Sequence, residues 1–159
     1  MSVAFRREED SEAEAANLHD RPISPHPNLV TPQGLAALDA ALAEARAAYG
    51  AAQSGGEVKA DRTAMARATR DLRYYAARRA SAQLVEPTPG AEVVSFGGWV
   101  TFDREDGRRQ TFHIVGEDEA DPAKGSVSYV SPLARALLGK GVGDTVPVGG
   151  AAVEIVAID

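Results

Sequence analysis

The chain has 159 residues, a hydrophobic share of 44% and no cysteine. This length provides for one ordinary domain or for a small core with an elongated element, and the lack of cysteine excludes disulfides, thiolate metal sites and cysteine nucleophiles. The formal net charge of −6 argues against free duplex DNA as a partner of the whole surface, because phosphate binding needs a basic face.

The N-terminal sequence, MSVAFRREEDSEAEAAN, lacks the apolar core of a signal peptide. No apolar run approaches the roughly 20 residues that are needed to cross a bilayer. Small secreted domains usually depend on disulfides, which this chain cannot form. We therefore expect a cytoplasmic monomer with no membrane partner.

The first 30 residues differ from the rest in composition. Residues 1–20 are acidic and show no clear period, and residues 21–32 contain four prolines. Proline fixes φ and moves the preceding residue out of the helical region. We expect residues 1–30 to be an acidic, Pro-rich N-terminal extension that is flexible or draped on the surface.

Two helical patterns follow. Thr31 suits an N-cap and Pro32 suits the first helical position. Apolar residues then recur at spacings of three and four up to Gln53, at Leu35, Leu38, Leu42, Ala45, Tyr49 and Ala52. After a Ser-Gly-Gly turn the second stripe is Val58, Met65, Ala68, Leu72, Tyr75, Arg79 and Ala82. These patterns predict an antiparallel coiled-coil hairpin over residues 31–85. The alternative, the core of a helical bundle, lacks a third long helix.

The pattern changes to β-strands after the Pro-rich residues 86–90. Asp106-Gly107 between β-rich runs is a strong hairpin signal. The expected elements are strands at 99–102, 110–115, 126–130, 145–148 and 153–158, and a short helix at 133–138 that Ser131 and Pro132 begin. Strands around one short helix predict a small domain over residues 91–159, and the whole chain is expected to be α+β.

Charge separates the two parts. Residues 60–83 carry six arginines and two acidic residues, a net charge of +4. Residues 87–159 carry six basic and eleven acidic residues, a net charge of −5. A basic arm on an acidic body predicts two parts with different contacts.

Four segments of the C-terminal part form a specific pattern: FGGWVTF (96–102), FHIVGEDEAD (112–121), GSVSYVSPLARALLGKGVGD (125–144) and VEIVAI (153–158). Few families join an acidic IVG turn to a Ser-Pro-capped helix that ends in Leu-Leu-Gly-Lys at this spacing. In these residues the chain resembles the C-terminal domain of the Gre transcript-cleavage and elongation factors. The helical hairpin lies where that family has its coiled coil, so the resemblance covers about residues 31–159.

The resemblance implies an FKBP-like fold for residues 91–159 and docking of this domain on bacterial RNA polymerase, at the mouth of the secondary channel. The coiled coil would then enter the channel. The candidate docking residues belong to the acidic turn and the Ser-Pro helix: Asp118, Glu119, Asp121, Ser131, Pro132 and Arg135. In the family the polymerase itself cleaves the transcript, so we expect no enzyme, no cofactor and no stably bound metal.

The turn between the helices is the candidate tip. The family pattern there is Gly-Asp-Leu-Lys-Glu-Asn, and this chain reads Gly-Glu-Val-Lys-Ala-Asp over residues 56–61. Acids at the family's tip help to hold a second Mg²⁺ in the polymerase active site, so Glu57 and Asp61 are the candidate Mg-assisting acids. Glu57 could also be an exposed loop acid, and Asp61 could be the N-cap of the second helix. Ala60 replaces the second acid of the family pattern.

Basic residues of the second helix are the candidate RNA contacts. Lys59, Arg67, Arg70 and Arg73 are the candidate contacts to the nascent RNA 3′ end or to the channel wall, since guanidinium groups bind phosphates well. The alternative is a solvated face of the coiled coil. Elsewhere, residues 116–121 lack EF-hand spacing, and three distant histidines suggest no zinc site.

We therefore expect a regulator of RNA polymerase that acts on paused or backtracked elongation complexes by stimulating the polymerase's transcript cleavage. Because an acid is missing at the tip and the arm is about one heptad shorter on each side than expected, a channel-occupying regulator without cleavage stimulation is the first alternative. An FKBP-like peptidyl-prolyl isomerase and a coiled-coil adaptor for a different partner are the less favoured functions.

Overall fold

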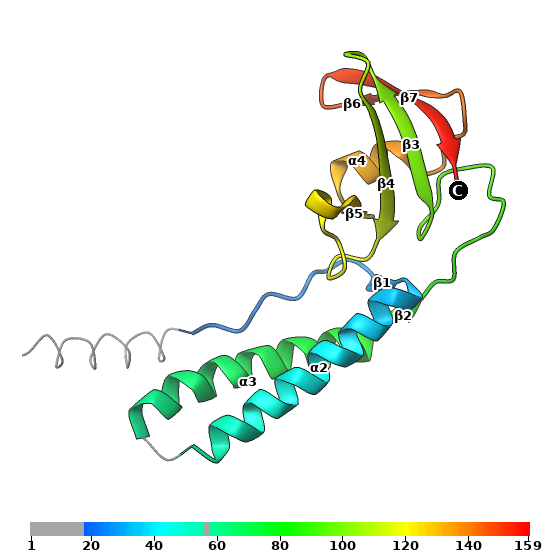
Figure 1. Ribbon diagram of the computed structural model, residues 1–159. Helices are drawn as coiled ribbons and strands as arrows, with labels where there is room; N and C mark the ends of the chain where they lie inside the picture. Colours follow the sequence, from blue (N-terminus) through cyan, green and yellow to red (C-terminus); the bar gives the residue numbers. More distant parts are fainter. Residues whose placement is uncertain (1–17, 56–57) are drawn as a thin grey trace, which may run out of the picture. The chain divides into compact units, whose positions relative to one another are not determined.

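The computed structural model describes residues 18–55 and 58–159, and for residues 58–61 it describes the backbone alone (Figure 1). These residues form two compact units, one built from the residues up to Pro25 with Leu38–Ser81, the other from His26–Ala37 with Ala82–Asp159. The chain is α+β, as predicted: two long helices dominate the first unit, and a five-stranded sheet dominates the second.

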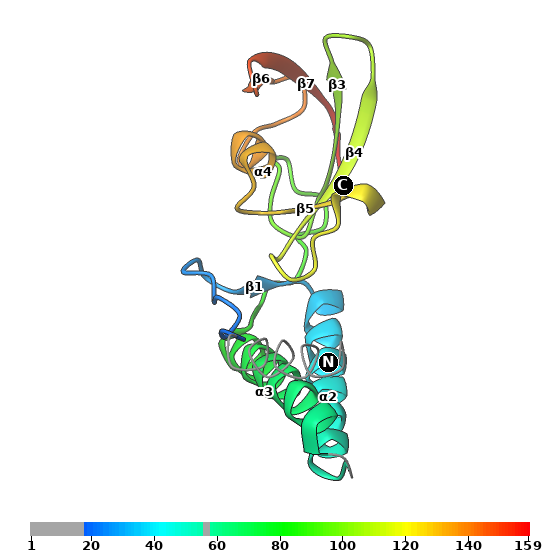
Figure 2. The same cartoon turned by 90° about the vertical axis from the view of Figure 1, so that its left-hand side faces the viewer.

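Two helices of similar length, α2 (Pro32–Gln53) and α3 (Val58–Ser81), lie side by side in both views (Figures 1 and 2). An ion pair of 2.5 Å joins Arg79 Nε, near the end of α3, to Asp39 Oδ1, near the start of α2. The two helices are therefore antiparallel. Pro32 is the first residue of α2 and Gln53 is the last, as the sequence predicts. Thr31 caps the first turn, and the sequence Ser-Gly-Gly follows the last turn.

The apolar stripe of α2 is its buried face. Leu38, Leu42 and Ala45 are buried at the spacings of four and three that the sequence shows. Among the side chains of α3 that the structure describes, Ala68 is the buried apolar one. The α3 stripe departs from expectation near its end, where Arg78 is buried and the expected Arg79 is half-buried and paired with Asp39. The buried position near the end of α3 therefore lies one residue before the position that the stripe predicts.

The second unit is a mixed sheet in the order β5-β4-β3-β7-β6. Its strands are β3 (Trp99–Arg104), β4 (Arg109–Val115), β5 (Ser126–Ser128), β6 (Thr145–Val148) and β7 (Ala151–Ile158). Neighbours are antiparallel except β4 and β5, which are parallel and joined through a 3-10 turn at Pro122–Lys124. Each expected strand is present; β5 ends at Ser128, two residues early, because the chain turns there toward the short helix.

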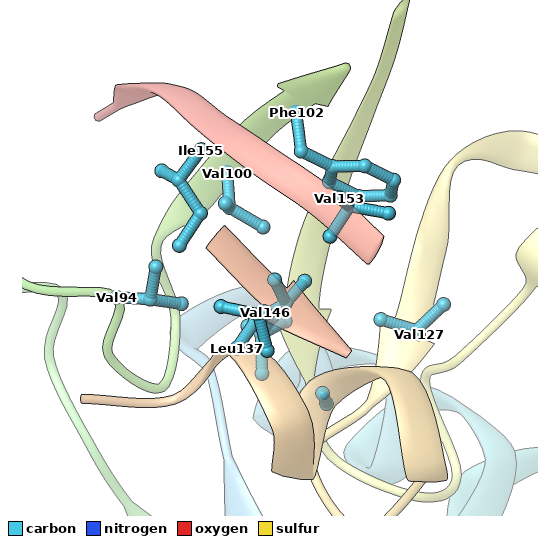
Figure 3. Close-up of a cluster of buried hydrophobic side chains, with 10 residues drawn as sticks. Val94, Val100, Phe102, Val127, Leu137, Val146, Val153 and Ile155 are labelled. Atoms are coloured by element: carbon cyan, nitrogen blue, oxygen red, sulfur yellow. The ribbon is translucent and has the colours of Figure 1, made fainter. Parts of the chain in front are cut away.

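One face of the sheet packs against the short helix α4 (Pro132–Leu137) (Figure 3). Val100 and Phe102 on β3 are fully buried and alternate with half-exposed residues, because successive side chains of a strand point to opposite faces. Leu137 of α4 closes the core from the other side (Figure 3). Ser131 Oγ accepts a hydrogen bond of 3.2 Å from Ala134 N, the cap that the sequence predicts.

A short parallel strand pair, absent from the sequence predictions, joins β1 (Leu29–Val30) to β2 (Gln83–Leu84) within the second unit. Backbone hydrogen bonds flank it, from Gln83 N to Asn28 O at 2.8 Å and from Val85 N to Val30 O at 2.9 Å. Asn28 and Val30 are buried. The end of the segment expected to be a flexible or draped extension is therefore an integral part of the sheet-containing unit.

A substitution at Gly116 tests whether β1 is held against the second unit, because the backbone of β1 passes directly over this glycine. A Cβ atom at this position would lie 2.3 Å from the carbonyl oxygen of Leu29. We expect Gly116→Ala to destabilise the second unit by about 1–3 kcal/mol, the usual cost of forcing backbone apart in a packed region. Urea unfolding followed by the fluorescence of Trp99, which lies in the second unit, measures this change.

The matched control is Gly50→Ala. Gly50 is helical, and nothing lies within 4 Å of a Cβ atom placed there. Since alanine is the better helix former, this change should stabilise the helical unit by up to about 1 kcal/mol. A Gly116→Ala protein as stable as the unchanged chain would show that β1 does not hold its place over Gly116.

Candidate functional site

The acidic turn that follows β4 is tightly folded. Glu119 N and Ala120 N both donate to Gly116 O at 3.2 Å. Further on, Asp121 N donates to Ser126 Oγ at 2.8 Å, and Ser126 N donates back to Asp121 O at 3.1 Å. The backbone of the turn is therefore fixed by its own hydrogen bonds and by the start of β5.

The acidic turn and the Ser-Pro turn leave the sheet at the same end. Val115, the last residue of β4, is paired with Ser128, the last residue of β5, and the two strands are parallel. Segments that follow the carboxyl ends of neighbouring parallel strands emerge at the same end of the sheet, and we call this end the shared edge of the two turns. Of the predicted docking residues, Asp118, Pro132 and Arg135 are exposed in these segments. Asp121 is half-buried, and its backbone N–H is bonded to Ser126, the first residue of β5.

Glu119 has a structural task. The Thr31 hydroxyl lies 2.7 Å from both carboxylate oxygens of Glu119 and donates to them, while it accepts a hydrogen bond of 3.0 Å from Gly34 N. Thr31 is only 2% exposed. The carboxylate also lies at the N-terminus of α2, where negative charge is favourable. Glu119 thus anchors the first turn of α2 to the acidic turn, within the second unit.

Gly34 is part of the same arrangement. A Cβ atom on Gly34 would come within 2.4 Å of Glu119 Oε2. Sequence reasoning identified Thr31 as a cap and Glu119 as a docking residue, and it missed that the two residues meet. No local signal could have found this pair, because 88 residues separate its members.

The structure describes only part of the candidate tip. Glu57 lies outside the described residues, and so do the side chains of Lys59 and Asp61. The backbone shows that α3 begins at Val58, so Asp61 lies within the first turn of this helix. The hypothesis that Asp61 is the N-cap of this helix is therefore wrong, although an acid in the first turn still favours the helix dipole.

The arginine row of α3 is partly paired with acids. Arg67 and Arg73 are exposed, and Arg70 is half-buried. Arg70 Nε lies 3.4 Å from Asp71 Oδ1, and Arg73 Nη1 donates to Asp20 Oδ1 at 3.3 Å. The pairing of Arg73 with an N-terminal residue was not foreseen from the sequence, because the prolines that follow Asp20 indicate only an extended chain.

The described part of the chain contains neither a metal-binding cluster nor a membrane-spanning helix. Over residues 18–55 and 58–159 there is no group of three or more His, Asp or Glu side chains that could hold a metal ion. Nor does any helix within these ranges combine the length and the apolar character needed to span a bilayer.

Comparison with known proteins places these elements in a family of transcription proteins. Residues 88–159 match the family model of the transcription elongation factor GreA/GreB C-terminal domain. GreA of Thioalkalivibrio sulfidiphilus is 39% identical over 127 residues, which cover 75% of this chain and 79% of that protein. The chain belongs to the GreA/GreB family of transcription elongation factors.

Other relatives are matched over less of their length. GreB of Yersinia pestis is 45% identical over 80 residues, which cover 50% of this chain and 47% of that protein. The chain thus spans about half the length of such relatives. Among solved structures, GreA factor homolog 1 (Gfh1) of Thermus thermophilus is similar, with 21% identity, coverage of 84% of this chain and 99% of that chain, and a TM-score of 0.40. A score of this size supports no conclusion about this chain.

Proposed function

We propose that this chain regulates bacterial RNA polymerase during elongation, by docking its second unit at the mouth of the secondary channel and inserting the α2–α3 pair into the channel. The single observation that carries this proposal is the shared edge of the acidic and Ser-Pro turns, where Asp118, Pro132 and Arg135 are exposed. Both turns lie in the segment that matches the GreA/GreB C-terminal domain. We further propose that this unit is FKBP-like.

The helical pair is suited to be a coiled-coil arm. Its buried positions recur at spacings of four and three along α2, and alanines at Ala45 and Ala68 allow the helices to approach closely. The 22 residues of α2 span about 33 Å at 1.5 Å per residue. An arm of this kind, with basic residues along α3, matches a narrow channel that contains RNA.

The tip contributes carboxylates to chemistry that the polymerase performs. Magnesium prefers carboxylate oxygens and is usually bound through one or two of them together with waters and substrate phosphates, so Glu57 and Asp61 have the right donor chemistry. In this proposal the ion belongs to the polymerase active site, and the chain shares it. A second Mg²⁺ stabilises the attacking and leaving oxygens of phosphodiester cleavage.

The alternative within this proposal is a regulator that occupies the channel without stimulating cleavage. Ala60 stands where the family pattern has its second acid. Two-metal chemistry is sensitive to displacements of about 1 Å, and neither a longer Glu57 side chain nor a shifted Asp61 reproduces the family arrangement. A transcript-cleavage assay on a stalled elongation complex with the cognate polymerase distinguishes stimulation from occupancy.

Docking can be tested with exposed residues of the shared edge. We expect the double variant Asp118→Asn, Arg135→Ala to weaken binding to core RNA polymerase by ~10-fold, equivalent to about 1.4 kcal/mol. Its stability should change by no more than about 0.5 kcal/mol, because both side chains are exposed. Fluorescence anisotropy of labelled protein gives the affinity, and urea unfolding gives the stability.

The matched control carries the same substitutions at the β3–β4 turn, at the opposite end of β4: Asp106→Asn, Arg108→Ala. This control should bind like the unchanged chain. Glu119→Gln should instead lower the stability, by about 1 kcal/mol, because the glutamine amide still accepts from buried Thr31 but without the negative charge. Equal binding by the docking variant and the unchanged chain would contradict the proposed docking surface.

A further inference from the structure

The residues from Leu18 to Pro25 belong to the same compact unit as α3, and we name them the N-terminal strap. Two ion pairs connect the strap to α3. Asp20 Oδ1 accepts from Arg73 Nη1 at 3.3 Å, and Arg21 Nη1 donates to Asp71 Oδ1 at 3.4 Å. Each of these two strap residues therefore meets a residue of opposite charge on α3.

Arg21 makes the most specific contact of the strap. Its guanidinium carbon lies 3.9 Å from the ring centroid of Tyr74 and 5.1 Å from that of Tyr75, and the two rings meet edge to face. A hydrogen bond with Tyr75 raises the pKa of Arg21 above its ordinary value and outweighs the opposing effect of partial burial. A planar cation stacked on an aromatic ring in this way is a defined docking contact.

The ion pair of Asp20 with Arg73 is open to solvent, whereas the pair of Arg21 with Asp71 is half-buried. The side chains of Arg73 and Asp20 are 68% and 65% exposed, and those of Arg21 and Asp71 are 36% and 38% exposed. Exposed ion pairs contribute little and are weakened by salt. An RNA chain presents closely spaced phosphates that can bind several arginines at once, so it can displace the single carboxylate of Asp20.

We propose that the N-terminal strap is an intramolecular competitor of RNA for the arginine face of α3, defined by Arg67, Arg70 and Arg73. In the docked state Asp20 occupies Arg73 and Arg21 covers Tyr74. RNA phosphates replace the carboxylate, and a base can replace the guanidinium on the tyrosine ring, since single-stranded RNA stacks on aromatic side chains. This proposal rests on the proposed function, in which the same arginines contact nascent RNA.

The competition can be measured on the full chain without polymerase. The probe is a nine-nucleotide oligouridylate, titrated at low salt because RNA binding weakens as salt rises. The side-chain NMR signals of Arg21 report the docked strap, because the ring current of Tyr74 shifts them. We expect the RNA to move these signals to the positions that they take at high salt, where the strap is released.

A double variant and a matched control give the second readout. Asp20→Asn, Arg21→Ala removes both ion pairs of the strap and the contact with Tyr74 without changing the net charge. It should bind the oligouridylate at least ~2- to 5-fold more tightly, because each exposed ion pair contributes up to about 1 kcal/mol. Asp106→Asn, Arg108→Ala makes the same substitutions at an exposed Asp–Arg pair of the β3–β4 turn and should bind like the unchanged chain. Circular dichroism checks that both variants are folded; if the double variant is not, the displacement of Arg21 in the unchanged chain decides alone.

Three results overturn the proposal: no binding of the oligouridylate, binding that leaves the Arg21 signals in place, or equal affinity of a folded double variant and the unchanged chain. Failure of the proposed function gives a different result. In that case the RNA still displaces Arg21, but neither the unchanged chain nor the double variant affects stalled elongation complexes.

Discussion

Replacing Leu42 with Asp is expected to separate α2 from α3 and to unfold most of the helical unit. Leu42 is buried between Leu38 and Ala45 on the face that packs against α3. A carboxylate there would have no partner, and burying such a charge costs far more than the few kcal/mol that a helical pair of this size gains. Far-ultraviolet circular dichroism should show the loss of a large part of the helical signal.

The neighbouring position supplies the control. Ala43 is exposed on the same turn of α2, so Ala43→Asp introduces the same charge without burying it and should leave the spectrum nearly unchanged. Trp99, the only tryptophan, lies in the second unit, so its near-ultraviolet signal should survive in both variants. An unchanged helical signal in the Leu42→Asp protein would exclude Leu42 from the helix–helix contact.

Removing the charges of the tip is expected to reduce cleavage stimulation by ~10-fold or more, the factor that corresponds to about 1.4 kcal/mol of transition-state stabilisation. The change is Glu57→Gln with Asp61→Asn, which keeps the size of both side chains but removes the anionic oxygens that Mg²⁺ prefers. Binding to the polymerase should persist, because the proposed docking surface lies in the second unit. The measurement is the rate of transcript cleavage in a stalled elongation complex.

The control for the tip neutralises two exposed acids elsewhere, as Glu44→Gln with Glu86→Gln, and should leave cleavage unaffected. If the unchanged chain accelerates cleavage and the tip variant does so equally well, the carboxylates have no part in it. If the unchanged chain binds but never accelerates cleavage, Ala60 and the short arm are decisive, and the chain is a channel-occupying regulator.

Local patterns predicted the elements well, because each has a short-range cause. The bounds of α2 followed from Thr31, Pro32 and the glycines after Gln53, and the β3–β4 hairpin followed from Asp106-Gly107. Predictions were weakest where the cause is distant in sequence. The β1–β2 pair, the bond from Thr31 to Glu119 and the stacking of Arg21 on Tyr74 all join segments at least 50 residues apart.

The candidate site shows the same division. Sequence motifs located the acidic turn and the Ser-Pro helix, and the parallel pairing of β4 with β5 explains why they share an edge. The motifs could not show that Asp118 is exposed whereas Glu119 is hydrogen-bonded to Thr31. That distinction depends on where β1 and the start of α2 pass, and no periodicity in the sequence records their path.

The central claim, that the end of the helical pair reaches the polymerase active site, can be tested by cross-linking. The chain has no cysteine, so Ser54→Cys, at an exposed position after α2, gives a unique attachment point for a photoactivated cross-linker. Ala151→Cys, exposed at the start of β7, is the control. In a stalled elongation complex, the probe at position 54 should cross-link to polymerase segments around the catalytic Mg²⁺, and the probe at position 151 should not. Cross-links from position 54 only to the outer surface of the polymerase, by a protein that binds it normally, would contradict the claim.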